Sequence, residues 1–269
     1  KYFGAHLLKK GAIFRVYAPN AAKVELQGDF SGWELLEMKQ KENPGVFEVT
    51  VQDAEAGMYY KYAITDAQGN VVYHCDPYGM LMELRPGFAS RIVDENWKFE
   101  DDEWTNNQNT EKNYNNPMNI YELHAGSWKQ KEDGSWYNYE ELAEELIPYL
   151  KKMGFNYIEF LPLSEHPADC SWGYQNTGFF APTSRYGTPQ QLKKLVELCH
   201  ENGIGVFTDF VPVHFAMDDY GLLNFDGTDG IPLVTGNRVC IQKAKATTKL
   251  VKLSKESFMK TMRKKMKGN

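Results

Sequence analysis

The chain has 269 residues, of which 42% are hydrophobic and 25% charged, a composition typical of a folded globular protein with one or two domains. Residues 1–235 carry a net charge of −16 and residues 236–269 carry +10, so most of the chain is too acidic to bind nucleic acid well. No run of about 18 apolar residues occurs, so we expect no membrane span. The four cysteines lack CxxC or zinc spacing and residues 1–8 lack a signal-peptide core, which favours free thiols, no metal site and a cytoplasmic location.

Residues 1–104 read as short strands separated by turns, with apolar or alternating runs at residues 12–17, 23–26, 46–51 and 58–64. No convincing helix lies between these runs, which predicts a β-sandwich that folds on its own. Residues 105–117 are polar and rich in Asn, and predict a linker. Four aromatic residues could stack on sugar rings, but most aromatics of so small a sandwich belong to its core, and we expect this of Trp33, Tyr59, Tyr60 and Trp97.

From residue 118 to residue 228 the pattern alternates between strands and helices. The first helix begins at Asn138, with Glu141 completing a capping box, and the second begins at Thr188, with Pro189 at its first position. Strand–helix–strand–helix–strand order predicts a parallel sheet with right-handed crossovers. The expected strands are residues 120–124, 157–161 and 205–211. After residue 228 the periodicity fails, and residues 229–269 read as a Lys-rich basic tail.

Four stretches of the chain resemble the glycogen (1,4-α-glucan) branching enzymes of the α-amylase superfamily. They match, in order, a sandwich module, the first barrel strand, the long loop after the second strand and the region of the third strand. The first stretch is residues 14–21 with 28–30, and the second is residues 121–128. The third consists of residues 165–167, 171–175 and 180–189, and the fourth is residues 209–215. The resemblance implies a multidomain fold, in which a starch-binding-like, immunoglobulin-like β-sandwich precedes the first part of a (β/α)8 TIM barrel that is incomplete after its third strand.

The resemblance also implies an activity. Branching enzymes cut an α-1,4 glucan such as glycogen or amylose and transfer the cut chain to a 6-hydroxyl, in glycogen biosynthesis, without a cofactor. Their Asp nucleophile follows the fourth barrel strand and their Glu acid/base follows the fifth, and retaining chemistry holds these carboxyls about 5–5.5 Å apart. Neither motif can be found in this sequence. We therefore expect an inactive fragment with no catalytic residue of its own.

Three residues carry over from the family as substrate-binding groups. Tyr174, in the run Trp-Gly-Tyr-Gln, would stack under the sugar at the cleavage point, and Asp209 and His214 would contact the hydroxyls of that sugar or support the site. An Asp on an otherwise apolar strand is costly unless it is paired, which also favours a site role for Asp209. Val213 stands where the family usually has Gly, a departure that could narrow the groove.

Several other polar residues allow more than one interpretation. His166 and Trp172 either line the acceptor groove or hold the loop in shape. Glu122, Glu159 and Glu165 match neither carboxyl of the family, so we expect structural roles for them.

Three alternative hypotheses stay open at this point. The chain could come from another member of the superfamily, trehalose-forming or debranching, although the runs His-Ala-Gly-Ser-Trp and Glu-His-Pro favour a branching enzyme. It could be a non-catalytic glucan-binding protein. The basic tail could bind polyanions, but a frame-shifted extension explains more simply why it replaces the expected barrel sequence.

Overall fold

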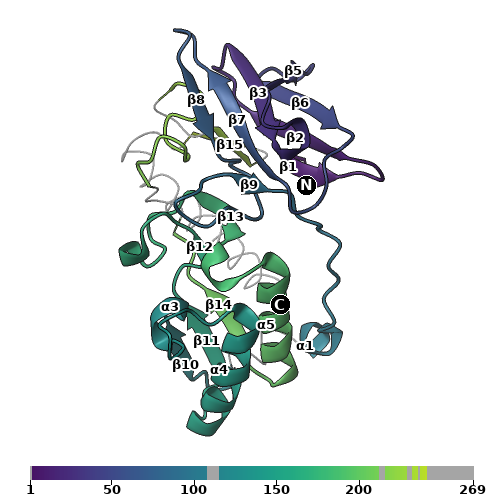
Figure 1. Ribbon diagram of the computed structural model, residues 1–269. Coiled ribbons are helices and arrows are strands. Elements are labelled where there is room, and N and C mark those ends of the chain that lie inside the picture. The colour runs from purple at the N-terminus through teal and green to yellow at the C-terminus, as the bar shows by residue number, and fades with distance from the viewer. Residues whose placement is uncertain (1, 108–114, 212–215, 229–231, 236, 241–269) are drawn as a thin grey trace, which may run out of the picture.

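The computed structural model describes residues 2–107, 115–211, 216–228, 232–235 and 237–240. Figure 1 shows an all-β part at the top and a parallel sheet with helices below it. The all-β part contains two antiparallel sheets, and the lower part contains a three-stranded parallel sheet in the order β10-β11-β14. Among the described residues this sheet is open and not closed into a barrel. The expected β-sandwich followed by an incomplete barrel is confirmed.

Alternation of apolar and polar side chains builds the sandwich. Every second residue of β2 (Ala12–Tyr17) is buried, and this strand pairs along its whole length with β6 (Val46–Val51). Phe14 of β2 packs on Tyr60 of the other sheet, with ring centroids 5.0 Å apart. The remaining strands are β1 (Gly4–Leu7) and β5 (Lys39–Gln40) in the first sheet, and β3 (Lys23–Gly28), β4 (Leu36–Glu37), β7 (Tyr59–Thr65), β8 (Val71–His74) and β9 (Ser90–Arg91) in the second.

Two amphipathic helices cover one face of the parallel sheet (Figure 1). The first, α4 (Tyr139–Met153), begins where the side chain of Asn138 accepts hydrogen bonds from first-turn amides, and α5 (Pro189–Glu201) begins with the same kind of cap at Thr188. The predicted capping box at Asn138 and the predicted start of the second helix at Thr188 are therefore confirmed. The strands are β10 (Ile120–Leu123), β11 (Tyr157–Phe160) and β14 (Gly205–Thr208), and the short helix α3 (Ala125–Trp128) follows β10.

The long loop between β11 and α5 is held together by the buried side chain of Arg185. Its Nη1 donates to Oε1 of Glu165 at 2.8 Å and to the carbonyl of His166 at 2.7 Å, and its Nε donates to Oδ1 of Asp169 at 2.8 Å. The loop contains β12 (Ser164–Glu165), η2 (Asp169–Ser171), β13 (Gly178–Pro182) and η3 (Ser184–Tyr186). This network gives an irregular segment a fixed shape.

The predicted linker begins inside a helix. The helix α1 (Asp102–Asn107) spans the expected end of the sandwich, and Trp104 stacks on His200 of α5 with ring centroids 4.6 Å apart. Residues 108–114 lie outside the described part of the chain. The boundaries of the domains therefore stay a prediction.

Beyond β14 the chain returns to the sandwich. Residues 216–228 lie against it, and the side chain of Phe225 is fully buried in the sandwich core. This packing argues against the expectation that the sandwich folds on its own, because part of its core comes from the second half of the chain. Within the predicted basic tail, β15 (Pro232–Thr235) and β16 (Asn237–Cys240) pair as an antiparallel hairpin.

Candidate functional site

The carboxyl ends of the three parallel strands meet at one edge of the sheet. The ladder runs one residue beyond the strands, because the amide of Leu161 donates to the carbonyl of Leu123 at 3.0 Å and the amide of Asp209 donates to that of Phe160 at 2.8 Å. His124, Leu161 and Asp209 consequently end the three strands at the same level. In α/β barrels this edge carries the functional groups.

Tyr174 and Asp209 meet at this edge. The hydroxyl of Tyr174 donates to Oδ2 of Asp209 at 2.9 Å, and this hydrogen bond, helped by burial, raises the pKa of Tyr174. The turn that presents Tyr174 depends on Gly173, whose φ is +85° and where an added Cβ would lie 2.3 Å from the carbonyl oxygen of Pro162. Two residues predicted to share a site, from segments 35 positions apart, are thus in direct contact.

Trp172 lies on the same turn and faces the first strand. Its side chain is 53% exposed and stacks on the ring of His124, with centroids 5.9 Å apart and an angle of 25° between the planes. Nδ1 of His124 lies 2.9 Å from Oγ of Ser127, and burial lowers the pKa of the imidazole. Sequence reasoning did not assign a site role to His124, although its position directly after the first parallel strand was the signal that could have found it.

His166 lies elsewhere in the loop. It is 3% exposed, and its Nδ1 lies 2.9 Å from the carbonyl oxygen of Ser164. Burial lowers the pKa of His166, so neutral imidazole is favoured there. These contacts are those of a residue that holds the loop. His214 and Val213 lie outside the described residues.

Glu122 and Glu159 form a second feature beside Tyr174. They are paired positions on the neighbouring parallel strands β10 and β11, so both side chains lie on the same face of the sheet. Both carboxylates contribute to the raised pKa of Tyr174. Glu165, by contrast, is buried and accepts hydrogen bonds from the amide and hydroxyl of Ser184, each at 2.7 Å, as expected for a structural role.

The sandwich presents a separate aromatic surface. The prediction that Trp33 belongs to the core is wrong, because this side chain is 40% exposed after the short helix η1 (Asp29–Ser31) and its Nε1 donates to Oδ1 of Asp29 at 3.0 Å. Nζ of Lys61 lies 5.5 Å from the centre of the Trp33 ring. Tyr60 is 1% exposed and is a core residue, as predicted.

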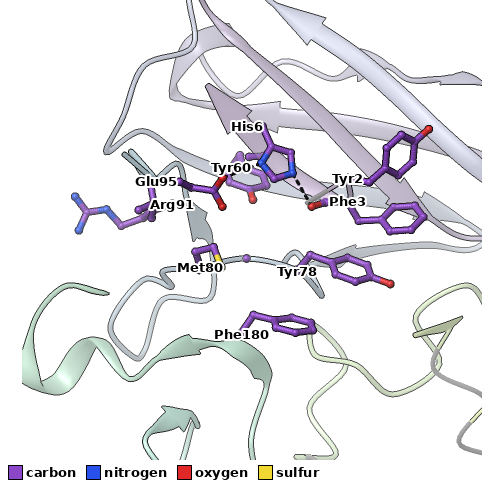
Figure 2. Close-up of a pocket in the computed structure, with 12 residues that line it drawn as sticks. Tyr2, Phe3, His6, Tyr60, Tyr78, Met80, Arg91, Glu95 and Phe180 are labelled. Atoms are coloured by element: carbon purple, nitrogen blue, oxygen red, sulfur yellow. Dashed lines mark hydrogen bonds and ion pairs between the residues drawn. The ribbon is translucent and has the colours of Figure 1, made fainter. Parts of the chain in front are cut away.

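A cavity of about 440 Å³ lies where the sandwich meets the lower part of the molecule (Figure 2). The ring of Tyr78 stacks between Phe3 and Phe180, at centroid distances of 5.0 and 5.7 Å. On its other side His6 and Glu95 lie 3.2 Å apart, Nδ1 to Oε2. The residues at the edge of the parallel sheet do not line this cavity.

Within the part of the chain that the structure describes, no group of three or more His, Cys, Asp or Glu could hold a metal ion. No helix of that part is long and apolar enough to cross a membrane. Cys75, Cys170 and Cys199 are free.

Two family models match the chain. Carbohydrate-binding module 48 (isoamylase N-terminal domain) matches residues 2–79, and the α-amylase catalytic domain matches residues 142–220. The chain is 47% identical over 232 residues to the 1,4-α-glucan branching enzyme GlgB of Geobacillus stearothermophilus, covering 84% of this chain and 36% of the relative. It is 45% identical to the enzyme of that name from Fusobacterium nucleatum, covering 85% of this chain and 38% of the relative. The chain thus spans just over a third of the length of these relatives.

Solved structures agree on the fold. A putative α-amylase from Salmonella typhimurium superposes with a TM-score of 0.65 at 24% identity, over 81% of this chain and 34% of the other. A pullulanase from Paenibacillus barengoltzii, complexed with maltotetraose, superposes with a TM-score of 0.64 at 20% identity, over 80% of this chain and 38% of the other. At these identities the likeness shows the fold alone.

Proposed function

We propose that this chain, a homologue of the 1,4-α-glucan branching enzymes of the α-amylase superfamily, supplies the substrate-binding part of such an enzyme. In this proposal the edge formed by Tyr174, Asp209, Trp172 and His124 binds an α-1,4 glucan. Glycogen and amylose are the expected partners, in glycogen biosynthesis. The observation that carries the proposal is the contact between Tyr174 and Asp209 at the carboxyl end of the parallel sheet.

The geometry of this pair suits a sugar ring. The hydrogen bond to Asp209 fixes the orientation of the Tyr174 ring, and an oriented aromatic face packs on the apolar face of a pyranose. Only Oδ2 of Asp209 accepts from Tyr174, and Oδ1 has no partner among the described residues. That oxygen is therefore available to a sugar hydroxyl.

We further propose that the 269-residue chain does not itself transfer glucan. A retaining pair of carboxyls flanks the scissile bond, one as nucleophile and the other as acid. Glu122 and Glu159 lie within β10 and β11, the first and second parallel strands, and therefore match neither of the strands after which the family carries these carboxyls. Their negative charges act instead on Tyr174.

Binding of maltoheptaose, measured by isothermal titration calorimetry, tests the glucan site. The matched variants are Tyr174→Ala, which removes the ring, and Tyr174→Phe, which removes only the hydroxyl. We expect about tenfold weaker binding for Tyr174→Ala, because the stacking face is lost, and a smaller loss for Tyr174→Phe. Both should be made in a Trp33→Ala background, so that binding to the sandwich surface does not mask the effect.

The opposite result would be clear. If the Trp33→Ala protein and its Tyr174→Ala derivative bind maltoheptaose equally tightly, the edge of the parallel sheet is not the glucan site.

A cytoplasmic location is part of the same proposal. It is supported by the free thiol of Cys170, which is exposed.

A further inference from the structure

The loop after β14 connects the candidate glucan edge with the β-sandwich. It starts at Asp209, on the candidate glucan edge, and its last described stretch, residues 216–228, lies on the sandwich. Phe225 is 0% exposed and belongs to the sandwich core, where its ring centroid is 4.8 Å from that of His74. A side chain from the second half of the chain thus completes the hydrophobic core of the first.

Hydrogen bonds reinforce this attachment. The end of β8 supplies two of them, and the turn after β2 supplies a third. The ring of Tyr220 also stacks on Phe88 at a centroid distance of 4.6 Å. The bonds run from the amide of Cys75 to the carbonyl of Tyr220 at 2.9 Å, between Nδ1 of His74 and the carbonyl oxygen of Gly221 at 3.0 Å, and from Nδ2 of Asn20 to Oδ2 of Asp226 at 2.7 Å.

The same loop is tied to the run that carries Tyr174. The amide of Ala216 donates to the carbonyl of Asn176 at 3.0 Å, and Nδ2 of Asn176 donates to the carbonyl of Val211 at 3.5 Å. Asn176 is only 2% exposed, so these bonds are shielded from water. Hydrogen bonds therefore link residues 216–228, which lie on the sandwich, to Asn176, and link Asn176 to Val211; these two residues are each two positions along the chain from Tyr174 and Asp209, respectively.

We propose that the β-sandwich anchors this loop and thereby positions Asp209 and Tyr174, with Phe225 as the positioning residue. Residues 216–228 form no helix or strand, and ordering such a segment costs conformational entropy at each residue. Burial of Phe225 in the sandwich offsets that cost. The sandwich then has a second task besides any binding of glucan on its own surface. The step that concerns substrate rests on the proposed glucan site.

Hydrogen exchange of the full 269-residue chain tests the anchor without any ligand. The variants are Phe225→Ala, the conservative Phe225→Leu, and the control Leu8→Ala, which removes an apolar side chain that is 47% exposed on the same sandwich. We expect Phe225→Ala to speed exchange about tenfold or more in residues 216–228 and also in residues 205–211. Phe225→Leu should restore most of the protection, and Leu8→Ala should change neither segment.

Two outcomes would overturn the proposal. One is faster exchange in residues 216–228 with unchanged exchange in residues 205–211, because the anchor would then not reach the site. The other is unchanged exchange in both segments. If Phe225→Ala unfolds the whole sandwich, Asn20→Ala takes its place, since it removes only the side-chain hydrogen bond to Asp226 and keeps the bond from the backbone amide. This variant should also speed exchange in residues 216–228 and in residues 205–211. Unchanged exchange in either segment contradicts the proposed anchor.

Maltoheptaose affinity then tests the positioning step. We expect Phe225→Ala to bind several-fold more weakly than wild type, with Phe225→Leu close to wild type. If exchange changes as predicted in both segments but the affinity for maltoheptaose does not change, the anchor does not position a glucan site. If Tyr174→Ala also leaves the affinity unchanged, the glucan site itself is at fault, and the exchange data still decide whether the loop is anchored.

Discussion

His124 shows how a single residue at a strand end can complete a site. The strand before it brings His124 to the level of Asp209, and Trp172 stacks on its imidazole from the loop between β11 and α5. Because Nδ1 is held by Ser127, Nε2 is the nitrogen that remains for a ligand among the described residues. We expect His124 and Trp172 to form one face next to the Tyr174 pair.

Removal of that face should weaken glucan binding. For Trp172→Ala we expect maltoheptaose to bind about two- to tenfold more weakly, since a lost aromatic stacking contact costs about 0.5–1.5 kcal/mol. His124→Ala should have a smaller effect in the same direction. Calorimetry of both variants, and intrinsic tryptophan fluorescence of the His124→Ala variant, measure the affinity for maltoheptaose. Affinities equal to that of wild type would leave Trp172 as a residue that only shapes the loop.

Asp76 is a buried residue with a pH-dependent effect on stability. It is 0% exposed, and its Oδ2 accepts hydrogen bonds from Tyr60 at 2.7 Å and Tyr62 at 3.2 Å. Burial raises the pKa of Asp76 from 3.8 to about 6, although these hydrogen bonds act in the opposite direction. A carboxyl whose pKa is higher in the folded state stabilises the fold fully below its unfolded pKa, and that contribution is lost as the pH rises through the folded pKa.

Asp76→Asn separates this effect from all other titrations. We expect the Tm of wild type minus the Tm of the variant to fall as the pH rises from 4 to 7, because only wild type must ionise a buried carboxyl. Thermal unfolding followed by circular dichroism at several pH values measures the difference. A difference that stays constant or grows with pH contradicts the assignment.

At the scale of elements, the loop between β11 and α5 depends on one buried ion network. The side chains of Arg185 and Glu165 are 1% and 7% exposed, whereas Asp169, which also binds Arg185, is 49% exposed. Removing one partner of a buried pair leaves the other charge without compensation. The shape of the loop, and with it the position of Trp172 and Tyr174, therefore depends on Arg185.

Arg185→Ala should be strongly destabilising, by about 3–5 kcal/mol, because Glu165 loses its buried partner. Arg85→Ala is the matched control: Arg85 also pairs with Asp169, but its side chain is 40% exposed, and we expect a loss below about 1 kcal/mol. Urea unfolding of both variants gives the comparison. Equal losses in the free energy of unfolding for the two variants would mean that the Arg185 network is no stronger than a surface ion pair.

Local chemistry made the helices of this part predictable. Asn138 with Glu141, and Thr188 with Pro189, place the starts of α4 and α5 because capping is decided by neighbours in sequence. The Arg185 network could not be predicted in this way, because its partners are up to 20 residues apart and only the folded loop brings them together.

For the whole molecule, the two halves of the chain share a core. Strand periodicity predicted the two sheets of the sandwich, but Phe225 lies in a turn-rich segment without periodicity, so the sequence did not reveal that it fills the sandwich. Trp33 was misplaced for a related reason. Aromatic composition alone does not distinguish a core ring from one that a loop holds at the surface.

In our proposal the whole chain holds glucan-binding groups without an acidic pair that can cut the glucan. Glu122 and Glu159, which are paired in the ladder and both raise the pKa of Tyr174, are the carboxylates on which this proposal could fail. Amylose incubated with the purified 269-residue chain and stained with iodine provides the most direct measurement. We predict constant absorbance at catalytic protein concentrations. A time-dependent fall in absorbance that disappears in Glu122→Gln or Glu159→Gln would contradict the claim.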